Sequence, residues 1–372
     1  MVGQSSAPKP STAAGPAVEI QGKPDFEKAM ERIYAWYDHE IIDRPPIRFS
    51  AHNADFAVPH RLAGKSWPDL RSRWFDAEYQ VDYFMASIAD RRFYAETFPV
   101  FWPNLGPEVY AAYFGCELEY GETTSYAVPN VRTWDDIGKL EFRRDNIYFR
   151  KTEELTRLAL EKCRGRFLVG YTDLHGGLDS AAAWRDPQQL CLDLVFDPDK
   201  VKRLVALAMA HFQEVYDHFD AMLKAAGQPS VTWMGIPSFG KMHIPSCDFA
   251  AMISPTMFEE FGLPVLREEV KPMTHNVFHV DGRGVLKHLE MILSVPEIQA
   301  IQWVQGMGLD TPILQWVPLI ERLQAAGKSI MVDLQVGELE EFIDRLRPKG
   351  LLLCIAADEA AQPDIIKRVE RW

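Results

Sequence analysis

The chain has 372 residues, of which 47% are hydrophobic and 25% are charged, a composition typical of a globular protein with a large core. Its formal net charge of −13 argues against a nucleic-acid partner, and no run of about 18 apolar residues predicts a membrane span. The five cysteines are odd in number, widely spaced and without a CxxC pair, so we expect reduced thiols in a cytoplasmic protein.

The first segment, residues 1–24, is rich in Ser, Ala, Pro and Gly without periodicity, which predicts a disordered tail. From residue 25 to residue 372, apolar runs alternate with segments of helical period, and we expect one domain there. Eight runs are interpreted as strands: residues 44–50, 93–104, 163–177, 230–240, 276–282, 298–306, 328–337 and 350–358.

Strands that alternate with helices favour an α/β fold with a parallel sheet, and eight repeats fit a single (β/α)8 TIM barrel. Such a barrel usually takes about 250 residues, which leaves room for additions. One addition is predicted at residues 114–134, where alternation and turn residues indicate an inserted hairpin. A doubly wound open sheet is the alternative, but the sequence lacks the GxGxxG and GxxxxGK[ST] patterns that would support it.

Polar residues follow most of the apolar runs, and in a TIM barrel the carboxyl ends of the strands form one mouth. Tryptophans fall at several of these ends, and aromatic walls suit a flat or sugar-like ligand. Packing between the barrel rim and the helices is the alternative for any single tryptophan. The candidate substrate-binding residues are Arg48, His52, Trp102, Tyr171, Trp233, His243, Gln302 and Trp303.

A candidate metal site begins with His279 and Asp281, which lie two apart on a predicted strand and therefore point the same way. With Cys354, three strands later, they would supply three ligands and leave a fourth position open, as in catalytic zinc sites. Alternatively, Asp281 orients the histidine or caps the following helix, and Cys354 is a small buried hydrophobe.

Asp173 and His175 form a second candidate pair, because they project together from the end of the third predicted strand. They could serve as base and orienting partner in proton transfer, or simply hold the loop by a hydrogen bond. Asp281 and Asp333 are further candidate catalytic carboxylates. Several carboxylates at one mouth repel one another unless a cation, a proton or a basic substrate compensates, which favours a metal or a shifted pKa.

Several stretches carry a resemblance to a known superfamily: residues 196–205 (FDPDKVKRLV), 254–270 (SPTMFEEFGLPVLREEV), 277–293 (VFHVDGRGVLKHLEMIL) and 349–358 (KGLLLCIAAD). The chain resembles the uroporphyrinogen decarboxylase superfamily, which includes zinc-dependent methyltransferases that work with corrinoid proteins. This resemblance implies a (β/α)8 barrel. The arginine-rich RQAGR segment of true uroporphyrinogen decarboxylases is replaced by DRPPIRF at residues 43–49, which favours the methyltransferase-like branch.

In that branch, zinc is bound by a His-x-Cys pair and a later Cys. Here His279 matches the histidine, Asp281 stands where the first cysteine would be, and Cys354 falls near the second. Aspartate can still bind zinc, but the loss of one thiolate puts thiol-activating chemistry in doubt.

The sequence therefore predicts an enzyme: a metal-dependent methyl- or alkyl-transferase that acts on a small polar substrate. It would use zinc or another divalent metal, with a corrinoid on a separate partner protein. The alternative is a lyase, hydrolase or decarboxylase that acts on a sugar-like or aromatic acid by carboxylate and histidine acid–base chemistry. A third interpretation is a barrel that binds a ligand or a corrinoid protein without chemistry.

Overall fold

The structure, a computed structural model, describes residues 18–50 and 58–372. Its largest sheet has six strands in the order β1-β10-β9-β8-β7-β6, all parallel, and a second parallel sheet pairs β2 with β5. The predicted α/β class is thereby confirmed. The parallel strands are β1 (Ile47–Phe49), β2 (Val100–Phe101), β5 (Leu168–Val169), β6 (Met242–His243), β7 (His275–Asp281), β8 (Ala300–Val304), β9 (Ser329–Leu334) and β10 (Leu351–Ile355).

Helices connect these strands, and local signals fix where several of them begin. Asn146 accepts a hydrogen bond from the backbone N–H of Tyr148 (2.8 Å) at the start of α6, and prolines occupy the first turns of α8, α9 and α14. The α-helices are α1 (Phe26–Tyr37), α2 (His60–Ala63), α3 (Leu70–Trp74), α4 (Ala77–Ser87), α5 (Val109–Ala112), α6 (Ile147–Cys163), α7 (Gly177–Arg185), α8 (Pro187–Phe196), α9 (Pro198–Met209), α10 (Phe212–Ala225), α11 (Pro255–Met257), α12 (Leu263–Val270), α13 (Leu289–Leu293), α14 (Val317–Ala325), α15 (Leu339–Arg345) and α16 (Gln362–Val369).

The predicted inserted hairpin is present. Strands β3 (Glu117–Tyr120) and β4 (Ser125–Val128) pair antiparallel, and the N–H of Gly121 donates to the carbonyl of Thr124 (2.8 Å) in the turn. The hairpin lies in the connection between β2 and α6, within the predicted range of residues 114–134.

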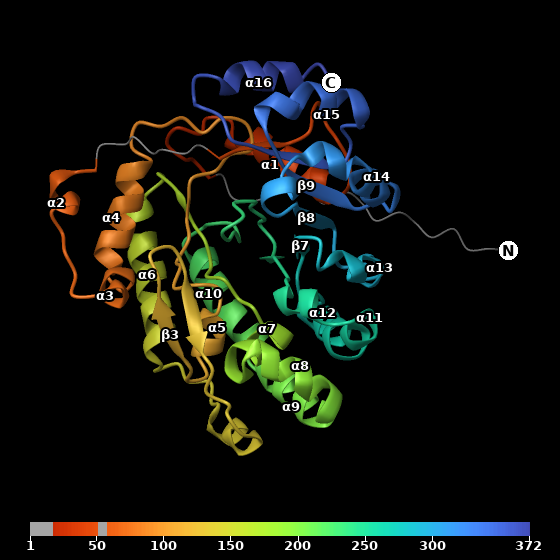
Figure 1. Cartoon of the computed structure of the whole chain (residues 1–372). Coiled ribbons are helices and arrows are strands. Elements are labelled where there is room, and N and C mark those ends of the chain that lie inside the picture. Colours follow the sequence, from red (N-terminus) through yellow and green to blue (C-terminus); the bar gives the residue numbers. More distant parts are fainter. Residues whose placement is uncertain (1–17, 51–57) are drawn as a thin grey trace.

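The six-stranded sheet is curled, and backbone hydrogen bonds link β1 and the segment before β6 to residues that flank the smaller sheet. The N–H of Glu96 donates to the carbonyl of Ile47 (2.8 Å), and the N–H of Tyr171 donates to the carbonyl of Val231 (2.9 Å). In Figure 1, β7, β8 and β9 run side by side, while α13, α14 and α15 lie at the periphery. This architecture is consistent with a TIM-barrel-like fold.

The prediction of a fourth strand at residues 230–240 is wrong. It makes only an isolated bridge between Ser230 and Ser238, and the strand at this position is β6, a few residues later. The chain turns instead, because the N–H of Gly235 bonds back to the carbonyl of Thr232 (2.9 Å) and Gly235 adopts φ +69°. Pro237, which has no N–H to donate, follows shortly after. The other seven predicted runs each overlap a described strand.

Helix α1 packs against the amino-terminal ends of the strands. Its buried residues Met30, Ile33 and Trp36 belong to one apolar cluster with Val277 and Met331 of β7 and β9. Trp36 also donates from its indole N–H to the carbonyl of Gly350 (3.1 Å) at the start of β10. One end of the strands is thus filled by α1, which leaves the carboxyl ends for a site.

The structure packs the last part of the predicted 1–24 tail against the domain. Ile20 and Lys23 are buried, and the N–H of Gln21 donates to the carbonyl of Gly165 (2.7 Å). The Lys23 ammonium group donates to the carboxylate of Asp25 and to the carbonyl of Ala95. Ala95 is far along the chain, so the composition of the tail could not predict this contact. Residues 1–17 lie outside the described part. Among the described helices, none is long and apolar enough to cross a membrane.

Candidate active site

Strand β7 ends in two polar residues that face one way. His279 and Asp281 are separated by Val280, which is buried in the layer between the strands and the helices. His279 lies opposite Gln302 of β8 in the strand register, and its Nδ1 is 2.7 Å from Gln302 Oε1. Because an amide oxygen only accepts, the Nδ1–H donates to it, and the Nε2 lone pair is available to bind a metal.

A third residue, Asp248, joins this pair from the loop after β6. The ligand atoms of Asp248, His279 and Asp281 all lie within 4.8 Å of one another. The N–H of His279 donates to the carbonyl of Pro245 (3.0 Å), and this bond holds the loop beside β7. Two carboxylates and one imidazole are a suitable ligand set for a divalent cation, and they leave coordination positions open. We refer to these three residues as the metal group.

The predicted metal ligand Cys354 does not belong to this group. It lies on β10, the third strand from β7 in the sheet, which corresponds to roughly 14 Å along the sheet. Its Sγ is 4.0 Å from Nη1 of Arg48, and burial raises the pKa of the Cys354 thiol to about 12. The metal group thus contains the predicted pair His279 and Asp281, and its third residue is Asp248 in place of the predicted Cys354.

The predicted pair Asp173 and His175 is formed after β5. His175 Nε2 lies 3.1 Å from Asp173 Oδ1, and its Nδ1 is 3.5 Å from Ser246 Oγ. Burial by itself lowers the pKa of His175, but the surrounding carboxylates, Asp173 foremost, raise it to about 10. His175 is therefore an imidazolium at neutral pH, with a proton to donate.

Asp179, which the sequence reasoning did not single out, connects this pair to the metal group. One of its oxygens lies 3.7 Å from His175 Nδ1, and its carboxylate accepts from the backbone N–H groups of Asp248 (3.1 Å) and Phe249 (2.9 Å). Burial and the charge of Asp248 raise the pKa of Asp179 to about 6. Its spacing of four residues from His175, at the start of α7, is the signal that could have identified it.

Two predicted substrate-binding residues lie beside His279. The Trp233 ring stands perpendicular to the His279 imidazole with 5.4 Å between the ring centroids, and Gln302 holds that imidazole by hydrogen bonding. Arg48 and Asp333 flank Cys354 in the strand register instead. Burial raises the pKa of Asp333, and the charge of Arg48 only partly offsets this. The predicted catalytic residue Asp333 therefore lies with Arg48 and Cys354 and is not part of the metal group.

Three predicted substrate-binding residues are buried behind the strands. Tyr171 OH lies 3.2 Å from His243 Nδ1, and His243 Nε2 lies 2.7 Å from Glu269 of α12. Trp303 packs against Trp316 with ring centroids 4.7 Å apart. All three of Tyr171, His243 and Trp303 are 1% exposed, so they contact the helical layer and not the mouth. For Trp303 the strand period is the reason, since its neighbour Gln302 faces the site.

The remaining two predicted substrate-binding residues are not brought to the metal group. Trp102 lines a separate pocket of about 350 Å³ together with Trp74 and Tyr79 from the α3–α4 region. His52 lies outside the described residues.

A solved structure of similar fold is the methyltransferase from Methanosarcina mazei. The two chains superpose with a TM-score of 0.59 over 88% of this chain and 91% of that one, at 12% sequence identity. An identity this low shows a shared fold and nothing about a shared reaction. No protein-family model matches the sequence, and no curated protein matches it either.

Proposed function

We propose that this protein is a metal-dependent methyl- or alkyl-transferase that acts on a small polar substrate. The observation that carries the proposal is the metal group of Asp248, His279 and Asp281 at the carboxyl end of β7. The resemblance to the uroporphyrinogen decarboxylase superfamily supports the same reaction class, and the fold, which is similar to that of an archaeal methyltransferase, is compatible with it. We further infer that the two parallel sheets and residues 230–240 form one complete (β/α)8 barrel.

The charges around the mouth support a bound cation. Asp173, Asp179, Asp248 and Asp281 are clustered with the imidazoles of His175 and His279, and the surrounding carboxylates raise the pKa of His175 to about 10. Carboxylates that are this close repel one another unless a positive charge compensates. A divalent metal in the group would bind and polarise the acceptor atom of the substrate.

The protein's own residues then have defined tasks. Gln302 fixes the orientation of His279, and Asp179 fixes the backbone of Asp248. His175, held by Asp173, can donate a proton or a hydrogen bond to the substrate, and Trp233 forms a wall beside His279. The methyl group would be delivered by a corrinoid on a separate protein, in keeping with the resemblance.

The first test is the metal content of the purified protein. It is measured by inductively coupled plasma mass spectrometry after the protein has been loaded with zinc or manganese and desalted. We expect about one metal per chain in the native protein and a loss of most of it in Asp248→Ala and His279→Ala, because each substitution removes a ligand. Cys354→Ser is the matched control and should retain the metal. Retention in Asp248→Ala together with loss in Cys354→Ser would show that Cys354, and not Asp248, is the third ligand.

The contacts among Asp173, His175 and Asp179 favour a second candidate, a lyase, hydrolase or decarboxylase that acts on a sugar-like or aromatic acid. In that case a substrate would be turned over by the metal-free protein, and His175→Gln would abolish turnover while His279→Ala would not. Loss of turnover in His279→Ala, together with turnover that the native protein loses on chelation and regains when metal is added, would exclude this metal-free mechanism, and a methylated product would then identify the transferase.

A further inference from the structure

A pocket of about 420 Å³ lies at the end of the molecule opposite the candidate active site. Three arginines line it: Arg91 and Arg92, which follow α4, and Arg166. Arg166 comes two residues before the first residue of β5, whereas Asp173 and His175 follow that strand. The pocket therefore opens near the amino-terminal ends of the strands and is separate from the metal group.

The three arginines differ from most others in their charge partners. In the described part of the chain, none of them forms an ion pair, whereas the half-buried Arg73 and the exposed Arg143 pair with Glu122 and Asp145. The Nε of Arg91 is buried without a hydrogen-bond partner. Burial lowers the pKa of Arg91, and the charge of Glu359 only partly offsets this. A buried guanidinium N–H without an acceptor is uncommon, since such donors are normally satisfied.

Backbone contacts hold the arginine segments in place. The N–H of Phe93 donates to the carbonyl of Gly22 (2.8 Å), while Gln21 bonds to Gly165, the neighbour of Arg166. Gly22 has φ +77°, and a Cβ at this position would lie 2.5 Å from the carbonyl oxygen of Arg91. The Arg91 guanidinium lies over the Phe93 ring, 5.5 Å from its centroid. These contacts fix the shape of the pocket before a ligand binds, so binding does not have to order the arginine segments.

We propose that this pocket binds a small multivalent anion of the phosphate class. Guanidinium groups bind phosphate oxygens through paired N–H donors, and three of them match a ligand with two or more negative charges. Asp90 is the one carboxylate among the residues that line the pocket, so their net charge is positive in a chain whose net charge is −13. The volume suits a small molecule. The proposal is independent of the proposed transferase activity.

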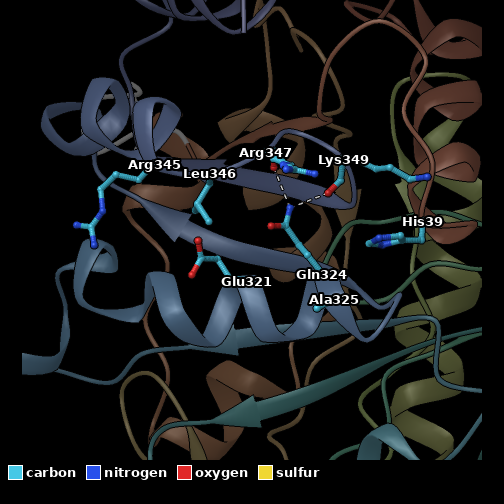
Figure 2. Close-up of a pocket in the computed structure, with 8 residues that line it drawn as sticks. All are labelled: His39, Glu321, Gln324, Ala325, Arg345, Leu346, Arg347 and Lys349. Carbon is cyan, nitrogen blue, oxygen red and sulfur yellow. Dashed lines mark hydrogen bonds between the residues drawn. The ribbon is translucent and has the colours of Figure 1, made fainter.

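Another pocket with basic residues provides the matched control. Figure 2 shows it at the start of β10, where Arg345, Arg347 and Lys349 line it together with Glu321. Here the cations have partners: Arg345 lies 3.2 Å from Glu341, and Lys349 lies 3.0 Å from Glu40. This pocket is therefore already neutralised in part, and we expect weaker anion binding there.

The test is calorimetric titration with pyrophosphate at physiological salt, with citrate as the carboxylate comparison. The native protein and Arg345→Gln/Arg347→Gln should bind pyrophosphate equally well. Arg91→Gln/Arg166→Gln should bind it at least about a hundredfold more weakly, because each lost charged hydrogen bond is worth about tenfold. Any effect of pyrophosphate on an active-site metal would be common to all three proteins.

Arg92→Gln, an exposed substitution with little risk to folding, is the second variant and should weaken binding by about tenfold. Equal affinity in all variants, or no binding to the native protein, would overturn the proposal. Binding of citrate in place of pyrophosphate would overturn the assignment to the phosphate class. A loss of transferase activity without a change in pyrophosphate binding would leave the pocket assignment standing.

Discussion

The Asp179 carboxylate connects the acid–base pair to the metal group. It accepts hydrogen bonds from the N–H groups of Asp248 and Phe249 and lies beside His175. Asp248 itself is exposed, so this backbone anchor and the neighbouring strand β7 are what fix its position. Residues that orient a metal ligand without touching the metal contribute strongly to affinity, because they hold the ligand ready.

We therefore expect Asp179→Ala to weaken metal binding by about 10- to 100-fold. The measurement is competition with a chromophoric chelator. Asn146→Ala serves as the control, since Asn146 also accepts from two backbone N–H groups at a helix start but lies at α6. The control should lose stability and retain metal affinity. An equal metal affinity in Asp179→Ala and the native protein would remove Asp179 from the site.

At the scale of elements, a buried ionic network joins α1, β1 and the segment before β2. Glu96, which is 1% exposed, contacts Arg32 of α1 (3.1 Å) and Arg44 (2.7 Å). Its Oε2 also accepts from the backbone N–H of Ile47 in β1 (2.7 Å). The same segment donates back from the N–H of Glu96 to the carbonyl of Ile47. The network therefore holds together the place where the two parallel sheets meet.

Glu96→Gln should lower the free energy of unfolding by about 3–5 kcal/mol, because it leaves the buried Arg44 guanidinium without its carboxylate partner, whereas Arg32 keeps its ion pair with Asp43 (2.7 Å). Chemical denaturation followed by circular dichroism measures this loss. Glu40→Gln, which breaks the exposed pair with Lys349, is the comparison and should cost less than about 1 kcal/mol. A similar loss of unfolding free energy in the two variants would show that the buried network stabilises the fold no more than an exposed ion pair does.

The strand period accounts for what the sequence could predict within single elements. It correctly places His279 and Asp281 on one face of β7, because alternation is a local property. By the same rule, Trp303 faces away from the side of β8 that carries Gln302. Trp303 is predicted as a substrate-binding residue only because it lies near the end of a strand. His243 lies beyond the fourth predicted strand, residues 230–240, but in the structure it belongs to β6 and is buried against Tyr171 and Glu269.

For the molecule as a whole, stability depends on the packing of α1 at the amino-terminal ends of the strands. His275, the first residue of β7, stacks on Tyr37 of α1 with ring centroids 4.0 Å apart, and its Nδ1 lies 2.8 Å from Ser238 Oγ. Burial lowers the pKa of His275 to about 4. The folded protein therefore holds this imidazole neutral over a pH range in which the unfolded chain is protonated.

The unfolded chain binds a proton at His275 below about pH 6.5, whereas the folded protein resists protonation until about pH 4. The stability associated with the neutral ring is therefore complete above pH 6.5 and falls by about 3 kcal/mol as the pH drops to 4. His275→Phe, which keeps a stacking ring without a titrating group, should flatten the curve of unfolding free energy in this window. Parallel curves for both proteins would contradict the assignment.

The sequence by itself determined the alternation of strands and helices apart from the fourth strand, the inserted hairpin, and the two polar pairs that follow β5 and end β7. These features follow from periodicity and from neighbours a few residues apart. Only the tertiary structure decided that Asp248 and not Cys354 joins His279, and that Asp179 bridges the two pairs. The physical reason is that a ligand set needs atoms within a few ångströms. Such proximity depends on how the sheet curls and where a loop lies, which no local pattern of residues encodes.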